Sequence, residues 1–212
     1  VNCTATDVNG NTNSCTATVT VIDGVNPTII CPSDPAAQAN DAAICGAIVG
    51  IELPYAGDNC DIITLSYSAA DATGTTVNDL ATGIAISGAN LAIPVATTYI
   101  NHTFPVGTAY VNWVVTDGSG NTAECTVTVV VNDEENPALV CPAPLIVSVD
   151  AGQCNANVSV ALATATDNCA VASITNTYTT NGADASANYP LGITPVYYTA
   201  IDIYGNSSTC TT

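Results

Sequence analysis

Apolar and polar residues alternate over short stretches of this chain, and turn-forming residues separate the stretches. Residues 16–22 (TATVTVI), 111–117 (VNWVVTD) and 126–131 (TVTVVV) alternate or run in β-branched residues, between clusters of Gly, Asn, Asp and Pro. Such segments are typical of short strands, and no stretch keeps a helical period for more than a few turns. The pattern therefore predicts an all-β fold.

The sequence also repeats itself. Residues 1–32 match residues 111–142, and a third copy of the same pattern begins at Val196. Residues 45–60 match residues 154–169, each segment beginning and ending with Cys. Repeats of about 100 residues built from short strands have the size of immunoglobulin-like β-sandwiches, so we predict tandem modules of this kind.

The repeats divide the chain into three parts. Residues 1–24 are predicted to be the final hairpin of a preceding module, 25–134 a complete module, and 135–212 a module lacking most of its last strand. The complete module carries an insertion at about 61–103. A sandwich without its last strand leaves an open edge. We therefore expect both ends to be completed, either by further polypeptide or by a strand from a neighbouring subunit.

Composition and charge exclude several classes of function. The 212 residues include 18 acidic side chains and no Lys or Arg, and the formal net charge is -18. Without basic side chains the chain cannot neutralise phosphates, so nucleic acids and anionic membrane surfaces are poor partners. No apolar run approaches the roughly 18 residues needed to span a bilayer, so no membrane insertion is expected.

A set of motifs recurs in the repeats. In the complete module the motifs are Cys31-Pro32, Cys45, Asp58-Asn59-Cys60, residues 104–108 (FPVGT), Thr116-Asp117, Gly120-Asn121 and Cys125. This combination resembles the hyalin repeat (HYR) module, and it covers 25–134, most of 135–212 and the fragment before them. The resemblance implies extracellular immunoglobulin-like modules in tandem, as in adhesion proteins, extracellular matrices and giant bacterial surface adhesins. It implies no catalytic activity.

Ten cysteines without paired C-x-x-C spacing predict disulfides and an extracellular or cell-surface location. In each module, two cysteines lie equally far from a turn. Two more in each module lie in loops at the same end of the sandwich. The predicted pairs are therefore Cys31–Cys45, Cys141–Cys154, Cys60–Cys125 and Cys169–Cys210.

The two remaining cysteines lie in the first hairpin. Cys3 occupies the position that Trp113 and Tyr198 hold in the other copies. Cys3 and Cys15 are symmetric about the turn near Asn9, so they could face each other across two strands. A cysteine of a neighbouring chain is the alternative partner for Cys15.

Carboxylates gather at the predicted junctions between modules. The linkers 21–27 (VIDGVNP) and 131–137 (VNDEENP) resemble in composition the calcium-binding linkers of cadherin-like tandem domains. Sandwich topology places each linker beside the Asp-Asn-Cys loop and the Asp-x-x-Gly-Asn hairpin of the module that it enters. The expected ligand sets are Asp23 with Asp58, Asn59 and Asp117, and Asp133, Glu134 and Glu135 with Asp167, Asn168 and Asp202.

The charge balance of these junctions favours a bound cation. Two carboxylates about 4 Å apart repel by roughly 4 kcal/mol at an effective dielectric constant of 20, and the chain has no Lys or Arg to relieve the repulsion. Calcium suits flexible carboxylate and carbonyl sites. We predict calcium at each junction, where it would stiffen the rod. In the alternative, the turn aspartates cap backbone amides and the linker acids are solvated.

Other residues add less to the functional prediction. Asn2, Asn101, Asn157 and Asn206 begin N-glycosylation sequons. His102 has no convincing catalytic partner in the sequence, and Trp113 is expected to fill the sandwich core.

The sequence therefore predicts a structural repeat segment of an extracellular filament or giant surface adhesin. Its expected partners are copies of itself, joined end to end, and glycans are a further candidate. A second hypothesis is a carbohydrate- or receptor-binding module that uses the insertion, which contains Tyr67 and Tyr99. A third is an accessory domain of a secreted enzyme.

Overall fold

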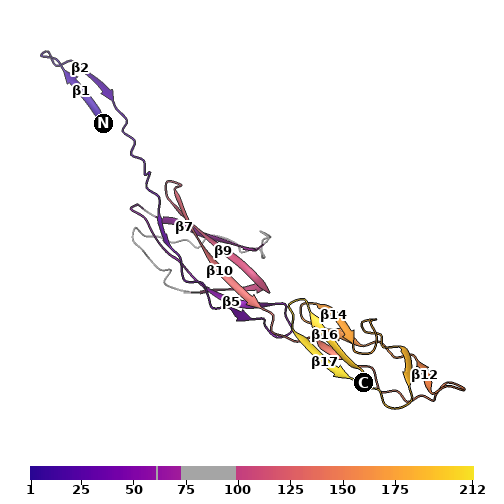
Figure 1. The fold of residues 1–212 in the computed structure, drawn as a ribbon. Helices are drawn as coiled ribbons and strands as arrows, with labels where there is room; N and C mark the ends of the chain where they lie inside the picture. Colours follow the sequence, from indigo (N-terminus) through magenta and orange to yellow (C-terminus); the bar gives the residue numbers. More distant parts are fainter. Residues whose placement is uncertain (61, 73–98) are drawn as a thin grey trace.

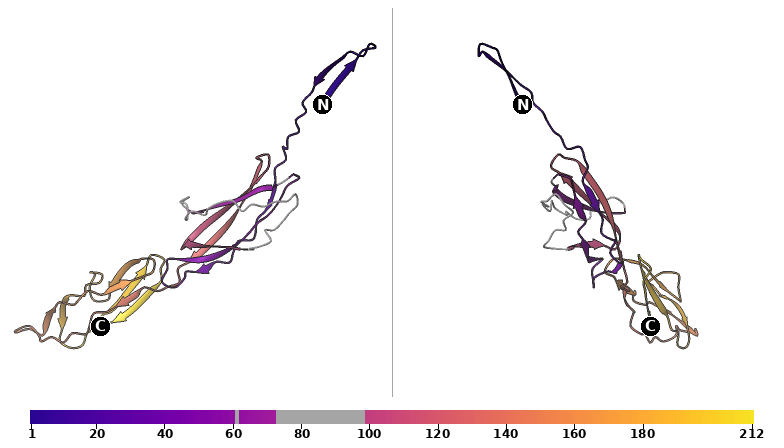
Figure 2. Two further views of the ribbon diagram at one scale, coloured as in Figure 1. Left: turned by 180° about the vertical axis from the view of Figure 1, so that it is seen from behind. Right: turned by 90° about the vertical axis from the view of Figure 1, so that its left-hand side faces the viewer.

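The computed structural model describes residues 1–60, 62–72 and 99–212. Figures 1 and 2 show an elongated arrangement, with a hairpin near the N-terminus at one end and the C-terminal strands toward the other. The fold is all-β, as predicted, and the strands build β-sandwich modules. In the described part of the chain, no helix has the length and apolar character needed to cross a membrane.

The N-terminal hairpin consists of β1 (Asn2–Thr6) and β2 (Thr12–Thr16), which pair antiparallel. Asp7 shapes its turn, because its Oδ1 accepts hydrogen bonds from the amides of Asn9 and Asn11, both at 2.8 Å. The pairing places Cys3 directly opposite Cys15, as the symmetry of the sequence predicts. Both cysteines are exposed and free.

Residues 25–134 contain eight strands among those described. These are β3 (Thr28–Ile30), β4 (Gln38–Ala39), β5 (Gly46–Glu52), β6 (Tyr55–Gly57), β7 (Ile62–Asp71), β8 (Tyr99–Pro105), β9 (Gly107–Asp117) and β10 (Thr122–Asn132). One sheet has the order β4-β10-β9-β7, and β3-β6 and β5-β8 form two further pairs. Most of the predicted insertion, residues 61 and 73–98, lies outside the described residues.

The core of this module follows from the alternation of its strands. Every second residue of β9 from Ala109 to Asp117 is buried, and β10 buries Val127, Val129 and Val131. Trp113 is fully buried in this core, which confirms the sequence prediction. Burial of one face of each strand thus produces the sandwich that the hydrophobic pattern predicts.

Residues 135–212 contain seven shorter strands. These are β11 (Ala138–Val140), β12 (Asn155–Val158), β13 (Thr164–Thr166), β14 (Val171–Asn176), β15 (Ala187–Pro190), β16 (Tyr197–Asp202) and β17 (Ser207–Thr211). They form the sheet β14-β16-β17 and the pairs β11-β13 and β12-β15. The buried core is small: its main cluster consists of Ala163, Ala185, Val196 and Tyr198, with partly buried side chains packed around them, and Ala156 and Ala200 are buried outside this cluster.

The disulfides differ from the predicted pairs. In the described part of the chain, the structure contains Cys31–Cys125, Cys45–Cys169 and Cys141–Cys210. The four predicted pairings, Cys31–Cys45, Cys141–Cys154, Cys60–Cys125 and Cys169–Cys210, are therefore wrong. Cys60 and Cys154 are free and exposed.

Strand pairing explains this correction. The prediction of Cys31–Cys45 assumed a hairpin, but β3 pairs with β6, β4 with β10, and β5 with β8. The end of β3 lies along β10, so Cys31 meets Cys125 of that strand. Cys141 meets Cys210 of β17 in the same way.

Candidate metal centre at the module junctions

The junction between residues 25–134 and 135–212 begins at Asp133, directly after β10. Asp133 is only 8% exposed. The side-chain amide of Asn206 donates a hydrogen bond to the Asp133 carbonyl at 3.1 Å, and the amide of Asn168 donates to Asp133 Oδ1 at 3.3 Å. The loop after β13 and the hairpin of β16 and β17 therefore both hold the linker, and these are the loop and the hairpin beside which the sequence places it.

Two more aspartates at this junction each use one carboxylate oxygen to cap a turn. Asp167 Oδ1 accepts from the amides of Cys169 at 2.9 Å and Ala170 at 3.1 Å. Asp202 Oδ1 accepts from the amides of Tyr204 at 2.8 Å and Asn206 at 2.9 Å. Turn capping therefore occupies only one oxygen of each residue.

The second oxygens have no hydrogen-bond partner. Among the described residues, buried oxygens without a partner at this junction are Asp133 Oδ2, Asp167 Oδ2, Asn168 Oδ1 and Asp202 Oδ2. Ligand atoms of Asp133, Asp167 and Cys169 lie within 4.8 Å of one another. Burial of unpaired carboxylate oxygens is unfavourable, and an oxygen-rich set suits a hard cation such as calcium. The Cys169 sulfur is in a disulfide, so it is not a thiolate ligand.

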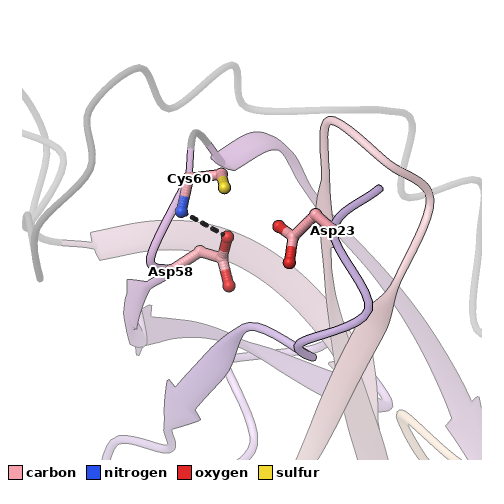
Figure 3. Close-up of side chains that lie close together, drawn as sticks. All are labelled: Asp23, Asp58 and Cys60. Atoms are coloured by element: carbon pink, nitrogen blue, oxygen red, sulfur yellow. Dashed lines mark hydrogen bonds between the residues drawn. The ribbon is translucent and has the colours of Figure 1, made fainter. Parts of the chain in front are cut away.

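The first junction repeats part of this arrangement (Figure 3). Asp58 Oδ2 accepts a hydrogen bond from the Cys60 amide at 2.9 Å, and ligand atoms of Asp23, Asp58 and Cys60 lie within 4.8 Å of one another. Asn59 donates a long bond to Asp23 Oδ1 at 3.5 Å. Asp23 Oδ2 and Asp58 Oδ1 are buried without a partner among the described residues.

Asp117 differs from its counterpart Asp202. Asp117 Oδ1 accepts from the amides of Ser119 and Asn121 at 2.8 Å, and its Oδ2 accepts from Asn121 Nδ2 at 2.7 Å. Both oxygens of Asp117 are therefore occupied. The first junction offers fewer free ligand atoms than the second.

The protonation of these groups follows from their hydrogen bonds. Burial raises the pKa of Asp117 and of Asp202, but amide hydrogen bonds, chiefly from Asn121 and Asn206, outweigh burial and leave both pKa values below the ordinary one. The Val25 amide lowers the pKa of Asp23. Asp23, Asp117 and Asp202 are therefore charged at neutral pH.

The structure does not bring Glu134 and Glu135 into the cluster. Glu134 is exposed, and its amide donates to Asn40 Oδ1 at 2.9 Å. Glu135 turns toward the preceding module, where Oε1 and Oε2 accept from the Ala43 amide at 2.9 and 3.2 Å. Ala43 has a φ of 59°, and this bond supports its left-handed turn.

The most important feature that the sequence prediction missed is the disulfide between modules. Cys45 lies in the turn before β5, and Cys169 lies in the loop after β13, so the bond Cys45–Cys169 crosses the junction. Asn168 supports the contact by donating a hydrogen bond to the Ile44 carbonyl at 3.3 Å. The equal spacing of Cys45–Cys60 and Cys154–Cys169 was the available signal, since it places one cysteine at each end of a module.

The predicted glycosylation sites differ in exposure. Asn2, Asn101 and Asn157 are exposed. Asn206 is partly buried, and its side-chain nitrogen donates to the Asp133 carbonyl, so a glycan there would remove a contact of the junction.

The aromatic residues proposed for a binding surface contact the module itself. Tyr67 packs against Trp113 with ring centroids 4.8 Å apart. Tyr99 donates a hydrogen bond to Glu52 Oε1 at 2.9 Å. His102 lies edge-on to Phe104 with ring centroids 4.9 Å apart. These contacts give Tyr67 and His102 structural roles and occupy the hydroxyl of Tyr99.

These features define a tandem, disulfide-linked β-sandwich protein with an acidic junction. The model of the HYR domain matches residues 70–131 and 132–212. Since the two matches cover more than half of the sequence, the chain belongs to the HYR domain family.

Comparison with other proteins adds little to this assignment. No curated protein matches the chain. One similar solved structure is SGBP-B of the Bacteroides ovatus mixed-linkage glucan utilization locus, in complex with a mixed-linkage heptasaccharide. The identity is 14%, the TM-score is 0.29, and the match covers 88% of this chain and 46% of that protein. A likeness at this level supports no argument about function.

Proposed function

We propose that this chain is a structural repeat segment of an extracellular filament or giant surface adhesin, in which the junctions between modules are rigid. HYR domains are typically extracellular repeats, and the disulfides suit an oxidising compartment. The observation that carries the proposal is Cys45–Cys169, because a covalent bond beside the linker restricts bending and twisting of one module against the next.

The contacts around the linker support the same role. Asn168 bonds to Ile44 and Glu135 bonds to Ala43, so both modules contribute to one hydrogen-bonded seam. A linker with such contacts on two sides transmits force instead of acting as a hinge. No catalytic role is part of the proposal.

The proposed function also includes a calcium ion bound at the second junction, between residues 25–134 and 135–212. Asp133 and Asp167, whose ligand atoms lie within 4.8 Å of each other, would hold it through the oxygens that turn capping leaves free, with Asn168 Oδ1 and Asp202 Oδ2 as additional ligands. The ion would neutralise carboxylates that come from the linker, a loop and a hairpin. It would therefore bind these three segments together.

Calcium is expected to raise the thermal stability of residues 135–212. A ligand at 100 times its dissociation constant stabilises the folded state by about 2.7 kcal/mol, which raises the Tm of a domain of this size by roughly 10–20 °C. Differential scanning calorimetry in calcium and in chelator measures the shift. Asp133→Asn should lose most of it, whereas Glu134→Gln, at an exposed neighbour, should keep it. Equal melting curves in calcium and chelator would remove the metal from the proposal.

Loss of the disulfide between modules is expected to make the junction flexible. We expect small-angle X-ray scattering of the native chain to fit one arrangement of the two modules. The variant Cys45→Ser/Cys169→Ser in chelator should require a broad range of arrangements. Cys154→Ser is the matched control, because it removes a free exposed thiol and should scatter like the native chain. If the double variant in chelator stays as rigid as the native chain, the stiffening role of the bond is wrong.

A further inference from the structure

The loop after β13 belongs to two connections between the modules. It supplies Asp167 and Asn168 to the candidate metal centre, and it supplies Cys169 to the disulfide with Cys45. The other end of each connection lies in the preceding module or in the linker, because Cys45 lies in the turn before β5 and Asp133 follows β10. The position of this one loop therefore affects both connections.

The backbone of Cys169 orients a ligand of the metal centre. Asp167 Oδ1 accepts a hydrogen bond from the Cys169 amide at 2.9 Å, and Asp167 Oδ2 is buried without a partner among the described residues. The Cys169 sulfur lies within 4.8 Å of a carboxylate oxygen of Asp133 and of one of Asp167. The same residue therefore fixes a metal ligand through its amide and bonds to the preceding module through its sulfur.

Asn168 contacts the linker, the preceding module and the disulfide. Its Nδ2 lies 3.3 Å from Asp133 Oδ1, 3.3 Å from the Ile44 carbonyl oxygen and 3.6 Å from the Cys169 sulfur. Its Oδ1 is buried and has no partner in the described part of the chain. The orientation of this free oxygen therefore depends on a loop that stays against both the linker and Ile44.

A cation at the metal centre has to hold the loop against the linker. Asp133 is buried, and its Oδ2 has no hydrogen-bond partner among the residues that the structure describes. Asp167 Oδ2 and Asn168 Oδ1 come from the loop, so binding to all three oxygens orders two separate segments. Ordering these segments at the moment of binding costs conformational entropy. The disulfide already restricts the loop, so it reduces this cost.

We propose that calcium binding at the second junction and the disulfide Cys45–Cys169 stabilise each other. The inference rests on the proposed function and names the regulation of its calcium site. The disulfide increases the affinity for calcium, because it holds Asp167 and Asn168 close to Asp133. By thermodynamic linkage, bound calcium favours the disulfide over the two thiols by the same factor.

The redox step is a thiol–disulfide exchange with glutathione. Reduction breaks the Cys45–Cys169 bond, leaves one thiol on each module, and converts two glutathione molecules into one glutathione disulfide. Calcium shifts this equilibrium toward the disulfide of the protein. The two connections therefore form together in a medium that is oxidising and contains calcium, and removal of either one weakens the other.

The affinity for calcium measures one side of the coupling. Isothermal titration calorimetry should show that Cys45→Ser/Cys169→Ser binds calcium about tenfold more weakly than the native chain, within the usual range for coupled sites. The heat that Asp133→Asn abolishes identifies binding at the second junction. Cys154→Ser is the matched control, because it removes a free exposed thiol and should bind like the native chain.

Two results of this titration would overturn the inference. Equal affinities in the native chain and the double variant would remove the coupling and leave calcium in the proposed function. A native chain that binds no calcium at the second junction would remove both. Small-angle X-ray scattering of the oxidised native chain tests the rigidity of the junction, and hence the proposed structural function, separately.

The redox equilibrium measures the other side of the coupling on the native chain. The chain is equilibrated with mixtures of reduced and oxidised glutathione, in calcium or in chelator, and its thiols are alkylated for mass spectrometry. Digestion at acidic residues is used, because the chain has no Lys or Arg for trypsin. Saturating calcium should favour Cys45–Cys169 about tenfold, which corresponds to about 30 mV for this two-electron couple. Asp133→Asn should abolish the shift, and Glu134→Gln, at an exposed neighbour, should keep it.

The disulfide Cys141–Cys210 distinguishes this coupling from general stabilisation by calcium. Both of its cysteines pack against the core of residues 135–212. Calcium should therefore change the equilibrium of Cys141–Cys210 much less than that of Cys45–Cys169. An equal change in the two disulfides, or no change in Cys45–Cys169, would overturn the inference.

Discussion

Removal of Cys141–Cys210 is expected to unfold residues 135–212 while residues 25–134 remain folded. The two cysteines are 69 residues apart in sequence. Cross-linking a loop of this length stabilises a domain by about 4 kcal/mol in the chain-entropy model. Small domains have a net stability of only about 5–15 kcal/mol. The stability of this module is expected at the low end of that range, because its main buried cluster consists of only two alanines, one valine and Tyr198.

The double variant Cys141→Ser/Cys210→Ser removes the disulfide without leaving an unpaired thiol. Hydrogen exchange followed by mass spectrometry should show loss of protection in β14, β16 and β17, and little change in β9 and β10. Cys154→Ser is the matched control, because the same chemical change at a free cysteine should leave protection intact. Native protection in β16 of the double variant would show that its small core is sufficient without the disulfide.

The hairpins and their turns could be predicted from the sequence because they are local. The Asp-x-x-Gly-Asn pattern shapes the turn between β9 and β10, where Asp117 accepts the amides of Ser119 and Asn121. The alternation of Val127, Val129 and Val131 likewise identifies the buried face of β10 without knowledge of its partners.

The disulfides could not be predicted because they depend on pairing between distant strands. Cys31 joins a strand 94 positions away in sequence, and Cys45 joins a residue of the next module. Cys31–Cys125 and Cys141–Cys210 each close within one module, so the wrong pairs came from the assumed hairpin, and only Cys45–Cys169 required knowledge of the neighbouring module. Equal spacing from a turn indicates a bridge only when the flanking segments form a hairpin.

The candidate metal centre could be predicted only in part, because some of its residues belong to local motifs and others depend on contacts with another module. Asp133, Asp167 and Asp202 belong to motifs whose place in a sandwich follows from topology, and the structure leaves one oxygen of each without a partner. Glu135 was misassigned because its partner, the Ala43 amide, belongs to the preceding module. A contact made through a neighbouring module leaves no local pattern in the sequence.

Replacement of Trp113 by alanine is expected to destabilise residues 25–134 by about 3–5 kcal/mol, the usual range for a large buried aromatic residue. Trp113 is fully buried and packs against Tyr67, which lies opposite it on the neighbouring strand β7. Its removal leaves a cavity that the surrounding strands of a disulfide-linked sandwich cannot close. Urea unfolding monitored by circular dichroism measures the loss in the free energy of unfolding.

Trp113→Phe separates packing from polarity. Trp113 Nε1 is buried, and the described residues provide it no hydrogen-bond partner, so phenylalanine removes an unsatisfied donor while it keeps much of the aromatic volume. We expect this variant to lose less than half of what the alanine variant loses. Equal losses in both variants would show that the indole nitrogen has a partner in solution. If Trp113→Ala loses less than about 1 kcal/mol, the core does not depend on this side chain.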